Sequence, residues 1–156
     1  LAFLTAREAS QHLALKSPES PTAYIIGADQ ILVCEGQIIN KPDDIVAAKN
    51  QLLWLAGKQH KLFSAIVLIR DGQRIWHHLA ESALIMRQFD AVFADFYIQH
   101  IGDAALLSPG SYQIESVGTS LFSKIDGDHF DILGLPLLPL LGILREHGLS
   151  PLERST

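Results

Sequence analysis

The chain has 156 residues, of which 48% are hydrophobic and 19% charged, and its formal net charge is −5. These proportions predict one folded domain over residues 1–156 and exclude a disordered chain. The negative charge gives no general attraction to nucleic acid or to anionic membranes. The longest apolar run, residues 133–144, is too short and too often broken by Gly and Pro for a membrane span. The single cysteine, Cys34, excludes an internal disulfide and fits a reducing compartment such as the cytoplasm.

The first residues have the pattern of a helix already in progress. Apolar residues form a rough helical stripe over residues 1–13, which Pro18 and Pro21 then interrupt. Because the sequence also starts without a methionine, we expect the chain to be a fragment or a trimmed product.

An apolar run over residues 23–34 predicts a central strand that is covered on both faces, and Asp29 lies inside it. An unpaired carboxylate in such a strand is costly. Asp29 is therefore either a structural acid, bonded to backbone N–H groups or to a lysine, or a metal ligand or general base at a strand end.

Glu35-Gly36 is a turn signal, after which residues 37–39 are expected to pair back on the strand. A two-residue turn places Asp29 opposite Pro42 and diagonal to Lys41, whereas a three-residue loop places it opposite Lys41. Lys41 is either a solvated loop lysine or a cation that holds a phosphate near the next helix.

A helix follows, which Asp43 or Asp44 can cap and Gly57 ends. Residues 60–89 then predict a long antiparallel hairpin with its turn at Asp71-Gly72. The buried stripe of the helix is expected to be Ile45, Ala48, Leu52 and Leu55, and the aromatic residues expected in the core are Trp54, Phe63 and Trp76.

Asp90 can cap a helix over residues 91–102, and short strands are expected over residues 110–116 and 119–125. Glu115 would then be a solvent-facing residue of an edge strand. Residues 127–136 predict a loop, and Pro136 opens the last helix. The acids and the histidine of this region form either a metal loop or an acidic surface loop: Asp126, Asp128, His129 and Asp131. Helices mix with strands, so the predicted class is α/β or α+β.

The segments "IIGADQILV", "NKPDD", "WLAGKQHKLFSAIVL", "GSYQIES" and "KIDGDHFDILGLPLLPLLGILREHG" follow one another in this order. In this combination the chain resembles the Maf family of nucleoside triphosphate pyrophosphatases, from about Leu1 to Gly148. The resemblance implies a mixed, twisted sheet flanked by helices and a requirement for a divalent metal. The implied reaction cleaves the bond between the α- and β-phosphates of non-standard nucleotides and gives a monophosphate and pyrophosphate. It also implies a link to septum formation, and homodimers are frequent in the family.

By the same resemblance, Asp29 is the catalytic base or a metal-linked carboxylate, and Lys41 contacts a phosphate. Gln30 and Glu115 are similar to the branch that acts on 7-methyl-GTP rather than to the branch that acts on dTTP and UTP. The implied metal is Mg²⁺ or Mn²⁺, linked to Asp29 and Glu115.

The chain also departs from the family pattern. The family begins with a strand and an S-x-S-P-R-R loop that binds phosphates, and this sequence lacks both, so we expect an N-terminally truncated domain. Thr5 stands where the family has a lysine. Each lost charge-assisted bond costs about 1.5–3 kcal/mol of binding. The alternative to an enzyme is therefore a catalytically weak module that binds nucleotides or a division-related partner.

Overall fold

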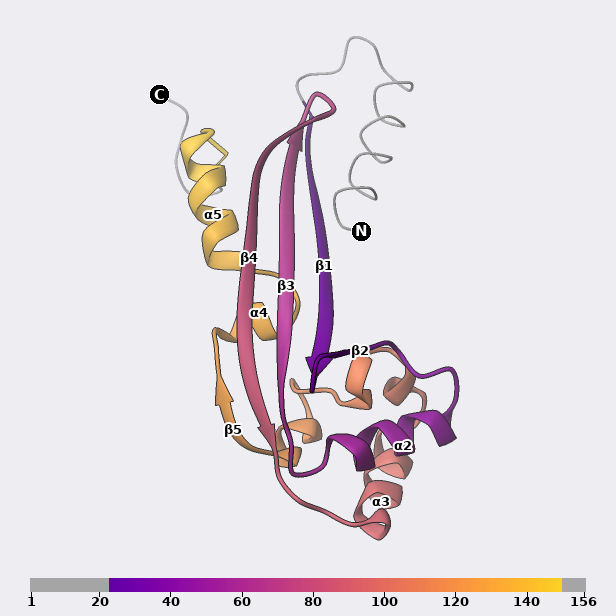
Figure 1. Cartoon of the computed structure of the whole chain (residues 1–156). Coiled ribbons are helices and arrows are strands. Elements are labelled where there is room, and N and C mark those ends of the chain that lie inside the picture. Colours follow the sequence, from indigo (N-terminus) through magenta and orange to yellow (C-terminus); the bar gives the residue numbers. More distant parts are fainter. Residues whose placement is uncertain (1–22, 150–156) are drawn as a thin grey trace. The chain divides into compact units, whose positions relative to one another are not determined.

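The computed structural model describes residues 23–149, which form a five-stranded sheet in the order β2-β1-β3-β4-β5 together with helices (Figure 1). The predicted mixed α/β class is confirmed. No helix within these residues is long and apolar enough to cross a bilayer. The strands are β1 (Tyr24–Cys34), β2 (Gln37–Ile39), β3 (Gln59–Arg70), β4 (Gln73–Met86) and β5 (Phe122–Asp126). The α-helices are α2 (Ile45–Leu55), α3 (Ala91–Ile101), α4 (His129–Ile132) and α5 (Leu137–Glu146), and the 3₁₀ helices are η1 (Gly102–Leu106), η2 (Pro109–Ser111) and η3 (Val117–Leu121).

The chain divides into two compact units. Within the described residues, the first unit consists of residues 23–30, 64–80 and 129–149, and the second unit consists of residues 31–63 and 81–128. Strands β1, β3 and β4 each contribute residues to both units.

The hairpin between β3 and β4 in the first unit closes through Asp71 and Gly72. Their φ angles are 50° and 79°, and two successive positive values are typical of the type I′ turn that joins antiparallel strands. The hairpin predicted from the Asp-Gly pair is therefore confirmed.

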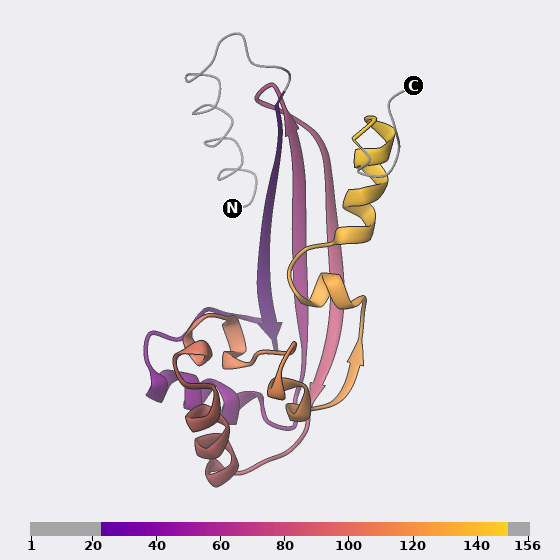
Figure 2. The same ribbon diagram turned by 180° about the vertical axis from the view of Figure 1, so that it is seen from behind.

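Helix α5 follows α4 at the C-terminal end of the described chain (Figure 2). It begins directly after the buried Pro136, as predicted, and Leu140 is its buried residue. At its end, Gly148 has φ 71°, and its N–H donates to the carbonyl of Arg145 while Leu149 donates to Leu144. These two bonds form a Schellman motif, which explains why the helix ends before Gly148.

Residues 23–34 were predicted to form a strand covered on both faces, and the prediction about the faces is wrong. The strand forms, and Leu32 and Cys34 are buried, but Ile26 is 45% exposed and Ile31 38% exposed in the described structure. Along β1 the pairing with β2 extends only over Leu32–Cys34. A continuous apolar run does not distinguish a central strand from one with such a short neighbour.

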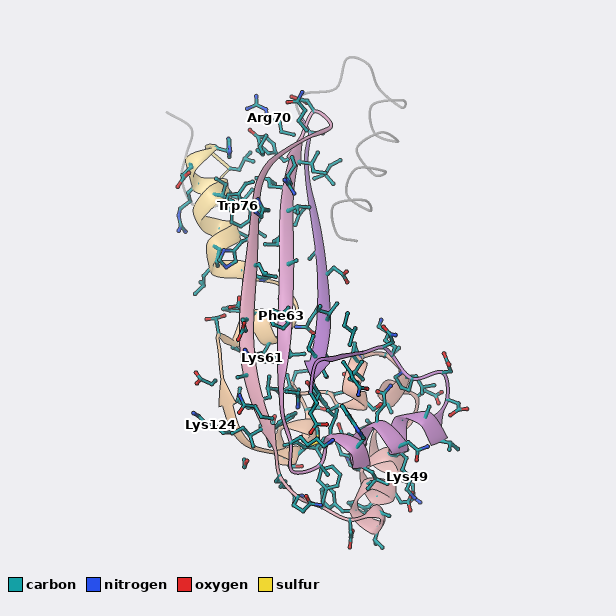
Figure 3. The ribbon with its side chains drawn as sticks, viewed as in Figure 1. Lys49, Lys61, Phe63, Arg70, Trp76 and Lys124 are labelled. Carbon is teal, nitrogen blue, oxygen red and sulfur yellow. The ribbon has the colours of Figure 1, made fainter. Side chains whose placement is uncertain are left out.

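The three aromatic residues expected in the core are instead half-buried. Phe63 and Trp76 lie on β3 and β4 (Figure 3), and the Trp76 ring stacks on His78 with 6.0 Å between centroids. The Trp54 ring carries the ammonium of Lys58 at 3.9 Å from its centroid. The two tryptophan rings have polar or charged partners, which aromatic faces attract at partly exposed positions.

Helices α2 and α3 of the second unit have the predicted caps. Asp44 accepts a hydrogen bond from Ala47 N at 2.7 Å, and Asp90 accepts one from Phe93 N at 2.9 Å. The two helices are joined by an ion pair of 2.6 Å from Lys49, labelled in Figure 3, to Asp95. In α2 the buried residues are Ala48, Leu52 and Leu55, whereas Ile45, also predicted to be buried, is 38% exposed in the first turn.

The strand predicted over residues 110–116 does not form. Instead η2 is followed by a turn over residues 114–116 and by η3. Side-chain hydroxyl groups donate hydrogen bonds to nearby backbone carbonyls: Ser116 donates to Gln113 O at 3.1 Å, and Thr119 donates to Ile114 O. Side chains that bond nearby backbone in this way stabilise turns in competition with strands.

The second predicted strand of this region is confirmed as β5, which pairs antiparallel with β4. The register matches Leu84 with Ile125, and the ladder shifts at Ile85/Met86. The loop predicted over residues 127–136 contains the short helix α4, a correction to the prediction. Gly134, with φ 96°, follows this helix closely.

Candidate functional site

The turn at Glu35-Gly36 has two residues, since Cys34 pairs with Gln37 and Leu32 with Ile39. This is the first of the two predicted registers. If the β1–β2 pairing continued, it would place Asp29 opposite Pro42. The ladder ends at Ile39, however. Asp29 belongs to the first unit and Lys41 to the second, so their proximity stays a prediction.

Asp29 is half-buried on β1. Within residues 23–149, the hydrogen bond recorded for its carboxylate is one from the backbone N–H of Gln30, at 3.0 Å. A carboxylate has about four lone-pair sites, so most of its accepting capacity remains for water, a metal or a protonated group. This side chain is only partly buried, and among the described residues its carboxylate belongs to no ion pair.

The neighbouring Gln30 is tied into the first unit by its carboxamide nitrogen. Nε2 lies 2.8 Å from Ser64 Oγ, 3.1 Å from the carbonyl of Asp131 and 3.0 Å from the carbonyl of Ile132. Ser64 itself donates to Asp131 O at 2.6 Å. Two carbonyl neighbours require the nitrogen on this side, so the orientation of the amide is fixed. Gln30 therefore holds α4 against β1, a structural role that the sequence did not indicate.

Lys41 is exposed in the segment that leads into α2. The residues on either side of it are held: Pro42 is buried, and the carbonyl of Asn40 accepts a hydrogen bond of 2.9 Å from Gln51 Nε2. The backbone at Lys41 is thus fixed while its ammonium group faces solvent, which suits a cation that binds an anionic ligand.

Glu115 is exposed in the turn over residues 114–116, not on the predicted edge strand. The Glu115 carboxylate affects the pKa of Tyr97. Burial raises the pKa of the Tyr97 hydroxyl, the hydrogen bond from Gln113 N lowers it, and the negative charge of Glu115 raises it. That bond, from Gln113 N to Tyr97 Oη, measures 3.2 Å. Tyr97 therefore anchors the backbone two residues before Glu115.

Four residues that support this part of the second unit were missed in the sequence. Gln51 joins two segments through its carboxamide, and Tyr97 holds the turn of Glu115. His60 and Tyr112 share a buried hydrogen bond. The available signal was weak, because Gln51 follows the polar pair Lys49-Asn50 and His60 has polar neighbours on both sides, and such polar residues usually face solvent.

No group of three or more His, Cys, Asp or Glu side chains is arranged to hold a metal within the part of the chain that the structure describes. In residues 126–131 the structure shows no such group, and Asp126 pairs with Lys124 at 3.7 Å. Mg²⁺ is commonly held by one or two carboxylates together with substrate phosphates. Asp29 belongs to the first unit and Glu115 to the second, so a metal held by both carboxylates stays a prediction.

An open depression of about 460 Å³ lies in the second unit and is lined by Arg87, Gln88, Phe89, Asp90 and Phe93. None of the predicted site residues lines it. Its arginine is already engaged, since Arg87 Nε donates to Ser120 O at 2.6 Å and the guanidinium lies over the Phe93 ring.

Comparison with known proteins agrees with the resemblance seen in the sequence. A family profile described as Maf-like protein matches residues 1–147. The 7-methyl-GTP pyrophosphatase of Brucella abortus is 50% identical over 129 residues, which are 83% of this chain and 65% of that protein. The nucleoside triphosphate pyrophosphatase of Nitrobacter hamburgensis is 41% identical over 152 residues, covering 97% of this chain and 74% of that protein. The nucleoside triphosphate pyrophosphatase of Rhodospirillum rubrum is 43% identical over 150 residues, which cover 93% of this chain and 74% of that protein.

The chain spans just under two thirds of the length of the Brucella relative and about three quarters of the other two. The family profile covers nearly all of this chain, and each of these relatives exceeds 40% identity. The chain belongs to the Maf family of proteins.

Proposed function

We propose that this chain is a nucleoside triphosphate pyrophosphatase that acts on 7-methyl-GTP and that residues 1–156 work as one domain. The observation that carries the proposal is the identity to the 7-methyl-GTP pyrophosphatase of Brucella abortus. The names of the Nitrobacter and Rhodospirillum relatives support the same class of reaction but do not specify a nucleotide base. In the proposed reaction, water adds across the anhydride bond between the α- and β-phosphates, and the monophosphate and pyrophosphate leave.

Asp29 is proposed to act as the general base. Its carboxylate is half-buried and, among the described residues, accepts one bond from a backbone N–H, so its other lone pairs could orient a water and accept one of its protons. The proton would return to solvent or to the leaving pyrophosphate.

Lys41 is proposed to bind the phosphates. An ammonium group forms strong, charge-assisted hydrogen bonds to phosphate oxygens and stabilises charge that develops on the leaving group. The fixed backbone on both sides of Lys41 supports this role, since it limits the positions that the ammonium group can reach.

A divalent metal, Mg²⁺ or Mn²⁺, held by Asp29, Glu115 and phosphate oxygens, would draw negative charge from the phosphate under attack. Gln30 and Glu115 are proposed to set the base preference. Gln30 would act through its carboxamide oxygen, because its nitrogen already donates within the first unit. A cytoplasmic location, a homodimer and a link to septum formation are further proposals that rest on family resemblance.

The proposed function is tested by its products. The purified chain is incubated with 7-methyl-GTP, dTTP or UTP and with Mg²⁺ or Mn²⁺, and the monophosphate, pyrophosphate and orthophosphate are separated and quantified. We expect equal amounts of monophosphate and pyrophosphate, fastest from 7-methyl-GTP, and a loss of turnover in the presence of a chelator. Release of orthophosphate would contradict the proposed bond, and nucleotide binding by calorimetry without turnover would establish a non-catalytic module.

A further inference from the structure

We propose that Gln51 is a positioning residue, whose carboxamide aligns the Lys41 segment with the segment that leads to Glu115. The inference rests on the proposed function, because its purpose is to place a phosphate-binding cation and an acid for the same reaction. All the residues involved belong to the second unit.

Gln51 lies on α2 and bonds to two segments with opposite ends of its carboxamide. Nε2 donates to Asn40 O at 2.9 Å. Oε1 accepts from Gly110 N at 3.1 Å and from Ser111 Oγ at 3.3 Å. A backbone carbonyl requires a donor and a backbone N–H requires an acceptor, so the orientation of this amide is fixed. A carboxylate at this position would keep the acceptor and lose the donor, and an apolar side chain would lose both.

At one end of this connection, the held carbonyl belongs to the residue directly before Lys41. Directly after Lys41, the ring of Pro42 restricts φ and is buried. The bond from Gln51 therefore closes the remaining backbone freedom on the N-terminal side of the lysine. Among the described residues, Gln51 is the side chain that donates to the carbonyl of Asn40, in the segment between β2 and α2.

At the other end, Gln51 bonds to a tight left-handed turn. Gly110 and Ser111 have φ 79° and φ 60°, and the serine is completely buried. A non-glycine residue in this conformation costs about 1–2 kcal/mol, so it persists where surrounding contacts hold it. A Cβ at Gly110 would lie 2.7 Å from the Tyr112 ring and 2.8 Å from Leu32, which shows how closely the turn is packed.

From this turn to Glu115 the chain is held by further hydrogen bonds, of which two involve buried rings. Tyr112 shares a hydrogen bond with His60, and Gln113 N donates to Tyr97 Oη. Gln51 is the anchor that also reaches the Lys41 segment. Its loss is therefore expected to change how Lys41 and Glu115 are aligned, beyond any change in stability.

The test compares Gln51→Met, which keeps the length of the side chain, with Asn50→Ala, an exposed neighbour on α2 as the matched control. Steady-state kinetics with 7-methyl-GTP are measured well below both melting temperatures, alone and in a Lys41→Ala background. Small displacements of catalytic groups cost up to about 100-fold in rate, so we expect Gln51→Met to lower kcat/KM roughly 10- to 100-fold, with KM raised. In the Lys41→Ala background the same substitution should change KM little. Wild-type KM and kcat in Gln51→Met, or an equal fold-change in both backgrounds, would overturn the inference.

A second measurement keeps this inference separate from the proposed function. If the wild-type chain turns over none of the nucleotides, the proposed function fails, but amide hydrogen exchange in Gln51→Met still reports on positioning. We expect faster exchange both near residues 40–43 and near residues 110–115, with Asn50→Ala unchanged. Unchanged exchange at either segment would overturn the role of Gln51 whatever the activity.

Discussion

His60 and Tyr112 share a hydrogen bond of 3.0 Å between the imidazole Nε2 and the phenol oxygen, inside the core of the second unit. Both side chains are almost fully buried, with 1% and 6% of their surface exposed. The other imidazole nitrogen, Nδ1, has no partner within the described residues. The pair connects β3 to the segment that carries Glu115, and burial lowers the pKa of His60 to about 4.

The first prediction concerns the pH dependence of stability. In the unfolded chain His60 has an ordinary pKa near 6.5, so between pH 6.5 and about 4 the unfolded state binds more protons than the folded state. The stabilisation is complete above pH 6.5 and is lost as the pH falls toward 4. Urea unfolding of the wild type should therefore lose about 2 kcal/mol more than His60→Phe between pH 7.5 and pH 5. An equal loss of unfolding free energy in the two proteins would show that folding does not lower the pKa of His60.

The second prediction concerns the partner of this histidine. Tyr112→Phe removes the hydroxyl and leaves His60 Nε2 buried without a hydrogen bond, which is expected to cost about 1–3 kcal/mol of unfolding free energy. Tyr24→Phe is the matched control, because Tyr24 is only half-buried and packs its ring at 5.6 Å from His147. Urea unfolding at pH 7.5 measures both. The interpretation fails if the two substitutions have the same effect.

The third prediction concerns Gly118, which packs under the turn of Glu115. A Cβ at this position would lie 2.2 Å from Gln113 O and 2.7 Å from its carbonyl carbon, both backbone atoms that cannot rotate away. We expect Gly118→Ala to destabilise the protein by about 1–3 kcal/mol and to displace the turn. In Gly142→Ala, on α5, the new methyl meets no heavy atom within 4 Å, so this control should stabilise by roughly 0.5–1 kcal/mol. Thermal unfolding of both variants checks the opposite signs.

The fourth prediction concerns Gln30. In Gln30→Glu a carboxylate oxygen would face the carbonyls of Asp131 and Ile132, where an N–H group now donates. Both carbonyls would lose this donor and face a negative charge, although Ser64 still donates to Asp131 O, and the change should cost about 1–3 kcal/mol at neutral pH. Gln30→Met, which keeps the length without the charge, should be the milder change. A glutamate variant as stable as the wild type would show that the three bonds of Nε2 contribute little.

Much of the fold was predictable because local signals agreed with one another. Asp71-Gly72 demanded a tight hairpin, and Asp44 and Asp90 had the side chains that cap helices. Residues 110–116 were predicted wrongly because an alternating pattern was outweighed by hydroxyl groups that bond the local backbone. The exposure of Ile26 was not predictable, because an apolar run carries no information on how long its neighbouring strand is.

The sequence predicts the acid and the lysine of the candidate site, which stay predictions, but it does not reveal the residues that support them. Asp29 and Lys41 stand out because a carboxylate in an apolar strand and a lysine before a proline are unusual. The bonds of Gln51 and the burial of His60 depend on segments far apart in the sequence, at residues 40, 51, 60 and 110–112. Such tertiary contacts leave no periodic trace in a single sequence.

The most direct test of the proposed chemistry is the rate of pyrophosphate release from 7-methyl-GTP by Asp29→Asn. Asparagine can still accept the bond from Gln30 N, so the substitution removes the charge and the basicity while keeping the local hydrogen bond. Asp103→Asn, on the exposed surface of η1, is the matched control. General-base catalysis is worth roughly 100- to 10,000-fold, so we predict a loss of that size in Asp29→Asn, with a melting temperature close to that of the wild type. A wild-type rate in Asp29→Asn would contradict the assignment of Asp29 as the base.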